Sequence, residues 1–156
     1  MIRYVLIVLV TVALLVLSMP AIDRAATLNT ERQVDTTLAA IDDAATDLES
    51  NEEVTPAGHP DPQRVVDLTL PASTLTTEGV DHFELDPHEN GGYTHARYVL
   101  ADGTTREQTI DATIVWNDPD STDATEIGGS SDQQLVFRLV ETDDGDPIVV
   151  ASYARV

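Results

Sequence analysis

The stretch YVLIVLVTVALLVLSMPAI, from Tyr4 to Ile22, decides the fold of this chain. Its 19 residues carry no charged side chain, and charged residues lie directly before and after it. At about 1.5 Å per residue, a helix of this length spans roughly the 30 Å hydrocarbon core of a bilayer. We therefore predict a transmembrane anchor over residues 1–22, with residues 4–22 in contact with membrane lipid.

Helical spacing continues after the apolar stretch, now with one apolar face and one acidic face. The apolar stripe consists of Val34, Leu38, Ile41, Ala45 and Leu48, at steps of 4, 3, 4 and 3. This spacing predicts an amphipathic helix over residues 23–50 that continues the anchor. Two partners fit the stripe: the protein's own β domain, or a helix of another copy or of a partner protein. At about two to three heptads, the Ala-rich stripe is too short to hold a coiled coil alone.

Pro20 lies near the outer end of the apolar stretch. Inside a helix a proline removes one backbone hydrogen bond and kinks the rod, which lipid tolerates when other groups satisfy the freed carbonyl. Pro20 therefore predicts either a kink in one continuous helix or the end of the membrane helix at the interface.

Proline density marks the end of the helical part of the chain. Residues 51–63 contain Pro56, Gly58, Pro60 and Pro62, which disfavour a helix and favour an extended, semi-rigid connector. From residue 64 onward the hydrophobic period changes to two. Strand-like runs follow at residues 66–70, 80–85, 93–100, 106–116, 134–141 and 147–156.

Two Asp-Gly pairs, at residues 102–103 and 144–145, indicate tight hairpins within this part of the chain. We predict that residues 64–156 form an antiparallel β domain of about five or six strands, with one face against the amphipathic helix. The fold class is therefore α+β. The polar segment 117–132 is long for so small a domain, so it is either mobile or a contact surface.

The charge of the chain is extreme. It has 28 Asp and Glu against 8 Lys and Arg, a net charge of −20, and all of its basic residues are Arg. At molar salt the Debye length falls to about 3 Å, so the self-repulsion of such a chain is screened. An acid-rich chain without Lys is similar to proteins of extremely halophilic archaea. The charge argues against nucleic acid as a partner and against a surface that docks on anionic lipid.

The apolar stretch is longer than the core of a secretory signal peptide. The candidate cleavage sites, Met19-Pro20-Ala21 and Arg24-Ala25-Ala26, are poor because they place Met and Arg where a small residue is needed. We therefore expect an uncleaved single-pass anchor. The short N-terminal flank favours a cytoplasmic N-terminus and an extracellular C-terminal domain. The alternative is a soluble protein in which the apolar helix is buried.

The sequence predicts no catalytic, cofactor-binding or metal-binding residue. The absence of Cys removes disulfides, thiolate catalysis and Cys-based metal sites. His59, His82, His88 and His95 match no ligand spacing with a known mechanism, and the Asp run at residues 143–146 lacks the alternation of an EF-hand loop. No nucleophile motif or phosphate-binding loop occurs. We expect a protein without enzymatic activity, and an anchored hydrolase has no residue pattern to support it.

The layout of a short N-terminus, an apolar segment with a proline near its end, an amphipathic continuation and a β domain resembles that of type IV pilin-like (pseudopilin-like) proteins. The resemblance implies that the helix anchors the subunit in the membrane and that the β domain faces outward. The chain departs from this family where Arg3 runs directly into Tyr4, without the Gly or Ala of a prepilin peptidase site. The Glu that the family places early in the apolar segment is also missing. The layout is also similar to that of small haloarchaeal membrane proteins associated with pilus-type secretion systems.

Two functions follow as hypotheses. The first is a non-polymerising accessory component of a pilus-type surface appendage or secretion complex, with other pilin-like or membrane-platform proteins as partners. The second is a membrane-anchored extracellular binding module for a solute or polymer, with segment 117–132 as its contact surface.

Overall fold

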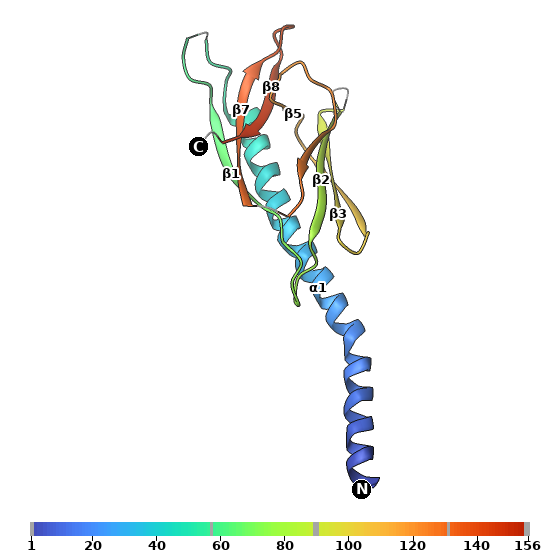
Figure 1. The fold of residues 1–156 in the computed structure, drawn as a ribbon. Helices are drawn as coiled ribbons and strands as arrows, with labels where there is room; N and C mark the ends of the chain where they lie inside the picture. Colours follow the sequence, from blue (N-terminus) through green and yellow to red (C-terminus); the bar gives the residue numbers. More distant parts are fainter. Residues whose placement is uncertain (1, 57, 89–90, 131, 155–156) are drawn as a thin grey trace.

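The structure is a computed structural model that describes residues 2–56, 58–88, 91–130 and 132–154. It consists of one long helix and eight strands, and the helix passes from a free N-terminal rod into the side of a β domain (Figure 1). The predicted α+β class is confirmed. Residue 1 of the predicted anchor, residue 57 of the predicted connector, and residues 89, 90, 131, 155 and 156 of the predicted β domain lie outside the described residues.

Helix α1 (Ile2–Asn51) is continuous through Pro20. A break of the helix at the interface is therefore excluded, and Figure 1 shows that α1 instead changes direction in its blue N-terminal half, where Pro20 lies. A helix bends at such a position because the proline has no N–H for the preceding turn. Residues 2–25 are exposed along the whole rod.

The predicted apolar stripe of α1 packs on the protein's own β domain. The side chains of Val34, Leu38, Ile41, Ala45 and Leu48 have no exposed surface and belong to one core cluster with residues of both sheets. Of the two partners left open by the sequence, the structure therefore selects the intramolecular one. Burial of these side chains from water stabilises the helix in its position.

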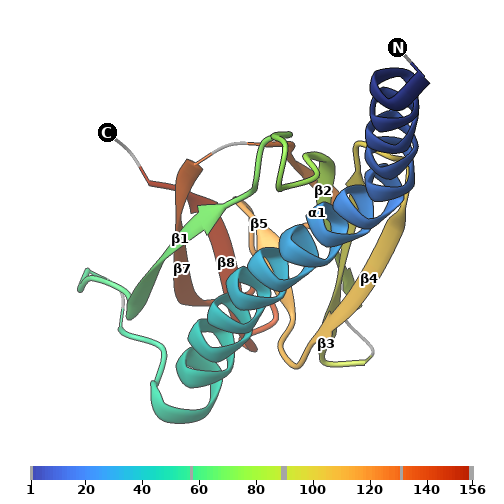
Figure 2. The same cartoon turned by 90° about the horizontal axis from the view of Figure 1, so that it is seen from below.

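The strands form two sheets where the sequence predicts one. The first sheet has the order β1-β7-β8-β5 and contains β1 (Gln63–Thr69), β5 (Ile114–Trp116), β7 (Asp132–Glu141) and β8 (Pro147–Tyr153). The second has the order β4-β3-β2-β6 and contains β2 (Val80–His88), β3 (Tyr93–Leu100), β4 (Thr105–Ile110) and β6 (Thr125–Gly128). All pairs are antiparallel except β5 with β8, which is parallel. Helix α1 runs between the two sheets and closes the open side of the domain (Figure 2).

The predicted strand at residues 106–116 is wrong because the chain changes sheets within it. β4 ends at Ile110, and β5 begins at Ile114 in the other sheet. The segment that crosses between the sheets, residues 111–113, is hydrogen-bonded to the buried hydroxyl of Thr94. The Thr94 Oγ1 donates to the carbonyl of Ala112 and accepts from the N–H of Ile114, both at 2.8 Å. The side chain replaces the ladder hydrogen bonds that the crossing segment gives up.

The predicted hairpins at Asp102-Gly103 and Asp144-Gly145 are confirmed. They join β3 to β4 and β7 to β8, and Gly103 and Gly145 have φ angles of 84° and 89°. Only glycine adopts such positive φ values without strain. β8 ends at Tyr153, earlier than the predicted strand end at residue 156, which lies outside the described residues.

Candidate functional surfaces

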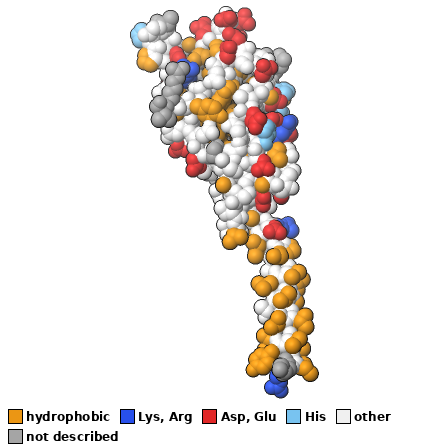
Figure 3. Space-filling view, in the orientation of Figure 1, with side chains coloured by type: hydrophobic (Ala, Val, Ile, Leu, Met, Phe, Trp, Pro, Cys, Tyr) orange, Lys and Arg blue, Asp and Glu red, His pale blue; other side chains and the backbone are white. Residues whose placement is uncertain are grey.

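The N-terminal rod is the first candidate surface. Within the described residues, α1 is the one helix long and apolar enough to cross a membrane, and its most apolar window is entirely exposed. Large apolar side chains are exposed along the whole length of the rod, and Figure 3 shows them on the face that it presents. Thr11 and Ser18 donate their hydroxyls to the carbonyls of Ile7 and Leu14, one turn earlier, so neither hydroxyl is left unpaired. The rod is therefore a candidate membrane anchor.

Acidic side chains of α1 form hydrogen bonds to the second sheet and to residues 111–113, the segment that crosses from β4 to β5. Glu31 accepts hydrogen bonds from the guanidinium of Arg106 on β4, with a closest N···O distance of 2.7 Å. Further along, Asp42 and Glu49 accept from the backbone N–H groups of Asp111 and Thr113, at 2.8 and 3.3 Å. Carboxylates off the apolar stripe therefore satisfy backbone groups that the crossing leaves without strand partners.

The C-terminal end of α1 is fastened to the first sheet. The Arg64 guanidinium, at the start of β1, bonds Asp47 and Glu52, each at 2.7 Å. Hydrogen bonds from Asn51 and then from Arg64 hold the pKa of Asp47 below its ordinary value. Together with the contacts to β4, this pair attaches α1 to both sheets, so the helix and the β domain form one unit.

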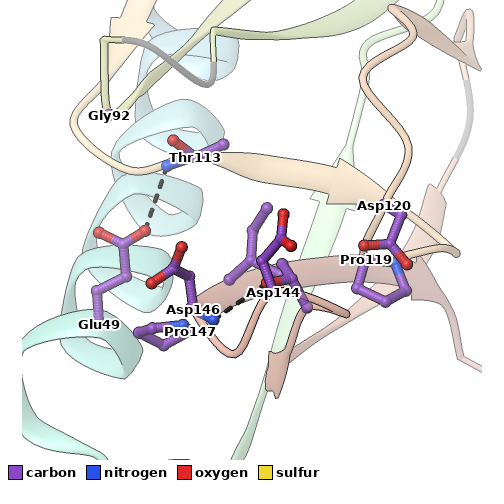
Figure 4. Close-up of a pocket in the computed structure, with 10 residues that line it drawn as sticks. Glu49, Gly92, Thr113, Pro119, Asp120, Asp144, Asp146 and Pro147 are labelled. Atoms are coloured by element: carbon purple, nitrogen blue, oxygen red, sulfur yellow. Dashed lines mark hydrogen bonds between the residues drawn. The ribbon is translucent and has the colours of Figure 1, made fainter.

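An open cavity lies at the end of the domain farthest from the rod. It has a volume of about 780 Å³ and is lined by Glu49, Gly92, Thr113, Pro119, Asp120, Thr142, Asp144, Asp146, Pro147 and Ile148. Figure 4 shows that its carboxylates come from α1, from the segment after β5 and from the β7–β8 turn. Burial raises the pKa of Glu49, and the hydrogen bond from the Thr113 N–H opposes that shift only in part. The lining carries carboxylates and no Arg or His, so its electrostatics favour cations over anions.

The four histidines lie in three separate places. His88 and His95 are in contact with each other and with the ring of Tyr93, with ring centroids 5.1 to 5.4 Å apart. His82 lies between two carboxylates, 2.8 Å from Glu84 and 3.1 Å from Glu126, while His59 is exposed in the connector. Among the described residues, no three His, Asp or Glu side chains are grouped so as to hold a metal ion.

Segment 117–132 is partly ordered by the sheets, which the sequence does not predict. Strand β6 lies within it and pairs with β2, and Tyr153 donates its hydroxyl to the carbonyl of Ile127 at 2.8 Å. Trp116, at the end of β5, packs edge-on against the Tyr153 ring of β8, with centroids 4.9 Å apart. Pro119 and Asp120, in the first part of the segment, line the acidic cavity.

Comparison with known protein families matches residues 1–154 to a domain of unknown function, DUF7311. The chain belongs to the DUF7311 family. The match covers the apolar rod as well as the β domain, so both parts belong to the DUF7311 unit. No curated protein matches the chain, and no solved structure does.

Proposed function

We propose that this protein is a non-enzymatic, membrane-anchored accessory component of a pilus-type surface appendage or secretion complex. One observation carries the proposal: a single uninterrupted helix is exposed and apolar for its first half and is part of a β-domain core in its second. In this arrangement the anchor holds the β domain at a fixed position beside the membrane. The pilin-like layout supports the assembly partners, which are other pilin-like proteins or membrane-platform proteins.

The proposed anchor has a defined orientation in the membrane of a haloarchaeal cell. The N-terminus is cytoplasmic, the β domain is extracellular, and the net charge of −20 suits the high salt of a haloarchaeal cell. Because the chain has no Cys, single cysteines serve as unique labels. A membrane-impermeant maleimide applied to intact cells should label Asp144→Cys, in the exposed β7–β8 turn, and should leave Ile2→Cys unlabelled until the cells are lysed. The opposite pattern would reverse the orientation.

Crosslinking in native membranes tests the assembly. Asp23 is exposed on α1 just beyond the apolar stretch, on the face where a neighbouring membrane helix would pass. A photoreactive maleimide on Asp23→Cys should capture pilin-like or membrane-platform subunits, whereas the same label on Asp144→Cys should capture fewer of them. Recovery of the monomer alone at both positions would contradict the proposal.

The acidic cavity favours a second candidate function, a membrane-anchored binding module for a solute or polymer. Its four carboxylates select a cationic ligand, and its place at the end farthest from the rod leaves it open to solvent. Titration of the full chain in nanodiscs with spermidine should shift the NMR signals of the Thr113 and Asp146 amides. Glu49→Gln should weaken that response, and a response unchanged by Glu49→Gln would show that the cavity is not the site.

A further inference from the structure

The loop between β1 and β2 reaches farther along α1 toward the N-terminus than any other part of the β domain (Figure 1). Two side chains of α1 hold it there. Asn29 donates its side-chain amide to the carbonyl of Thr76 at 3.1 Å, and Thr30 donates its hydroxyl to the carbonyl of Glu78 at 2.7 Å. Asn29 is seven residues past Ile22, which corresponds to about 10 Å along the helix. The loop therefore approaches the outer end of the apolar rod.

Leu75, at the tip of this loop, is 89% exposed. Its side chain and Thr76 form one wall of a shallow groove whose other wall is α1, through Leu17, Ser18, Ala21, Ile22 and Ala25. Most of these helix residues belong to the apolar stretch. The apolar surface of the rod is thus continuous with an apolar residue of the β domain.

The tip of the loop is also free of charge, and Glu78, next to the start of β2, is the one charged residue between β1 and β2. Residues 68–77 (LTLPASTLTT) contain no Asp, Glu, Arg or His, which makes them the longest uncharged run outside the apolar stretch. In a chain with 28 acids this run lies in the loop that reaches farthest toward the rod (Figure 1). A surface without carboxylates avoids the repulsion that keeps the rest of the domain away from anionic lipid headgroups.

Several polar groups of the loop are paired within the loop. The Thr74 hydroxyl accepts from the backbone N–H groups of Thr76 and Thr77, at 3.2 and 3.1 Å. The Thr74 N–H donates to the carbonyl of Thr77 at 2.8 Å, and the Ser73 hydroxyl accepts from the N–H of Gly79 at 3.0 Å. A backbone satisfied in this way costs less to transfer out of water.

We propose that the β1–β2 loop inserts its tip into the outer interface of the bilayer that holds the rod, with Leu75 among the lipid chains. The loop is then a second membrane contact that seats the β domain directly on the membrane surface. This inference rests on the proposed membrane anchoring. Lipid is the occupant of the groove because most of its α1 wall lies within the membrane-spanning stretch, where the surrounding medium is hydrocarbon.

Site-directed spin labelling tests the contact on the full chain in nanodiscs of phosphatidylcholine and phosphatidylglycerol, in molar potassium chloride. The label is placed at Leu75→Cys, with Leu17→Cys as the control inside the bilayer and Val65→Cys as the control in water. Val65 is an exposed apolar residue of β1 and so matches Leu75 in type. Collision rates with oxygen, which concentrates in lipid, are compared with those of a water-soluble nickel chelate.

We expect the ratio of oxygen to nickel collision rates to be severalfold higher at positions 75 and 17 than at position 65. If position 75 behaves as position 65 does while position 17 reports lipid, the loop contact is wrong and the anchor stands. If position 17 also reports water, the anchoring itself fails. If position 75 is shielded from both reagents, and more so as the protein-to-lipid ratio rises, a second copy occupies the groove and the inference is overturned.

A second pair of variants tests the role of the leucine without a label on it. The label is moved to Ala72→Cys, another exposed loop residue, and is combined with Leu75→Asp or with Val65→Asp. Leu75→Asp should lower the ratio at position 72 severalfold because a carboxylate resists entry into lipid, whereas Val65→Asp should leave it unchanged. Equal ratios in the two variants would contradict insertion driven by Leu75.

Discussion

At the scale of single residues, Thr94 shows what a sequence pattern conceals. It lies on a strand with alternating burial and reads as an ordinary strand residue. In the structure its buried hydroxyl serves both a carbonyl and an N–H of the segment that crosses between the sheets. Nothing in the sequence around Thr94 indicates this partner, because the partner lies about 20 residues further along the chain.

Thr94→Val keeps the shape of the side chain and removes both hydrogen bonds. It leaves a carbonyl and an N–H buried without partners, so we expect the free energy of unfolding to fall by about 2–3 kcal/mol. Urea unfolding in detergent micelles at molar salt, followed by the fluorescence of Trp116, measures the change. Thr109→Val, on the exposed side of β4, should change the stability by less than about 0.5 kcal/mol. Equal effects of the two substitutions would contradict the assigned role.

His82 provides a prediction about pH. Its hydrogen bond to Glu84, and more weakly that to Glu126, raises the pKa of the imidazole above its ordinary value of 6.5, although burial opposes this. The protonated ring therefore stabilises the fold. This stabilisation is complete below the ordinary pKa and is lost as the pH rises through the raised pKa.

An NMR titration of the histidine ring signals measures this shift. Glu84→Gln should bring the pKa of His82 down toward its ordinary value. Glu84 also bonds Arg97, so Glu107→Gln is the control, because Glu107 bonds Arg97 and not His82. A pKa of His82 that is the same in Glu84→Gln and in the unsubstituted protein would show that the carboxylate is not the cause.

At the scale of elements, helix α1 is the part that the sequence predicts best. The absence of charge from Tyr4 to Ile22 and the spacing of the later apolar residues are local patterns, and both lead to the observed helix and its buried stripe. The sheets are predicted less well because pairing depends on contacts distant in sequence. The short strands β5 and β6 carry too few residues to show a period of two, and β6 lies in a stretch of polar turn residues.

The stripe of α1 makes a quantitative prediction. Leu38 is fully buried between the sheets, so Leu38→Ala should lower the free energy of unfolding by about 2–5 kcal/mol through lost burial and the cavity it leaves. Leu28→Ala removes the same atoms from a side chain that is 45% exposed and should cost about 1 kcal/mol or less. Urea unfolding followed by circular dichroism compares the two variants. A larger loss for Leu28→Ala would mean that the stripe faces a different partner.

At the scale of the whole molecule, charge is the dominant feature. The sequence predicts the acidic surface directly, because 28 carboxylates cannot be buried in a domain of this size. It does not predict the acidic cavity, since the residues that line it come from segments between Glu49 and Ile148 that only the fold brings together. The sequence also does not predict the proposed role of the β1–β2 loop, because the position of its uncharged run beside the rod is known only from the fold.

The net charge predicts a dependence on salt. Dialysis from molar to millimolar salt removes the screening between carboxylates, so the β domain should lose structure and regain it when salt is restored. Far-ultraviolet circular dichroism and Trp116 fluorescence in detergent micelles measure the transition. Potassium chloride and sodium chloride at equal ionic strength should act alike if screening is the cause. Spectra that stay constant between the two salt concentrations would contradict this prediction.

Helix α1 also links the anchor rigidly to the β domain, because the same helix forms the anchor and part of the domain core. No flexible linker separates the anchor from the domain, because α1 is continuous. The azimuth of the β domain about the membrane normal is therefore set by the number of helical residues between the anchor and the domain. One alanine inserted between Ile22 and Asp23 would turn the domain by about 100° and raise it by about 1.5 Å relative to the anchor. The packing of α1 on the sheets, which begins beyond Asp23, would stay as it is, whereas residues 17–22 would turn away from Leu75. Binding of a partner to the β domain therefore depends on the rotational phase of α1, which sets the face that the domain presents, as much as on the chemistry of that face.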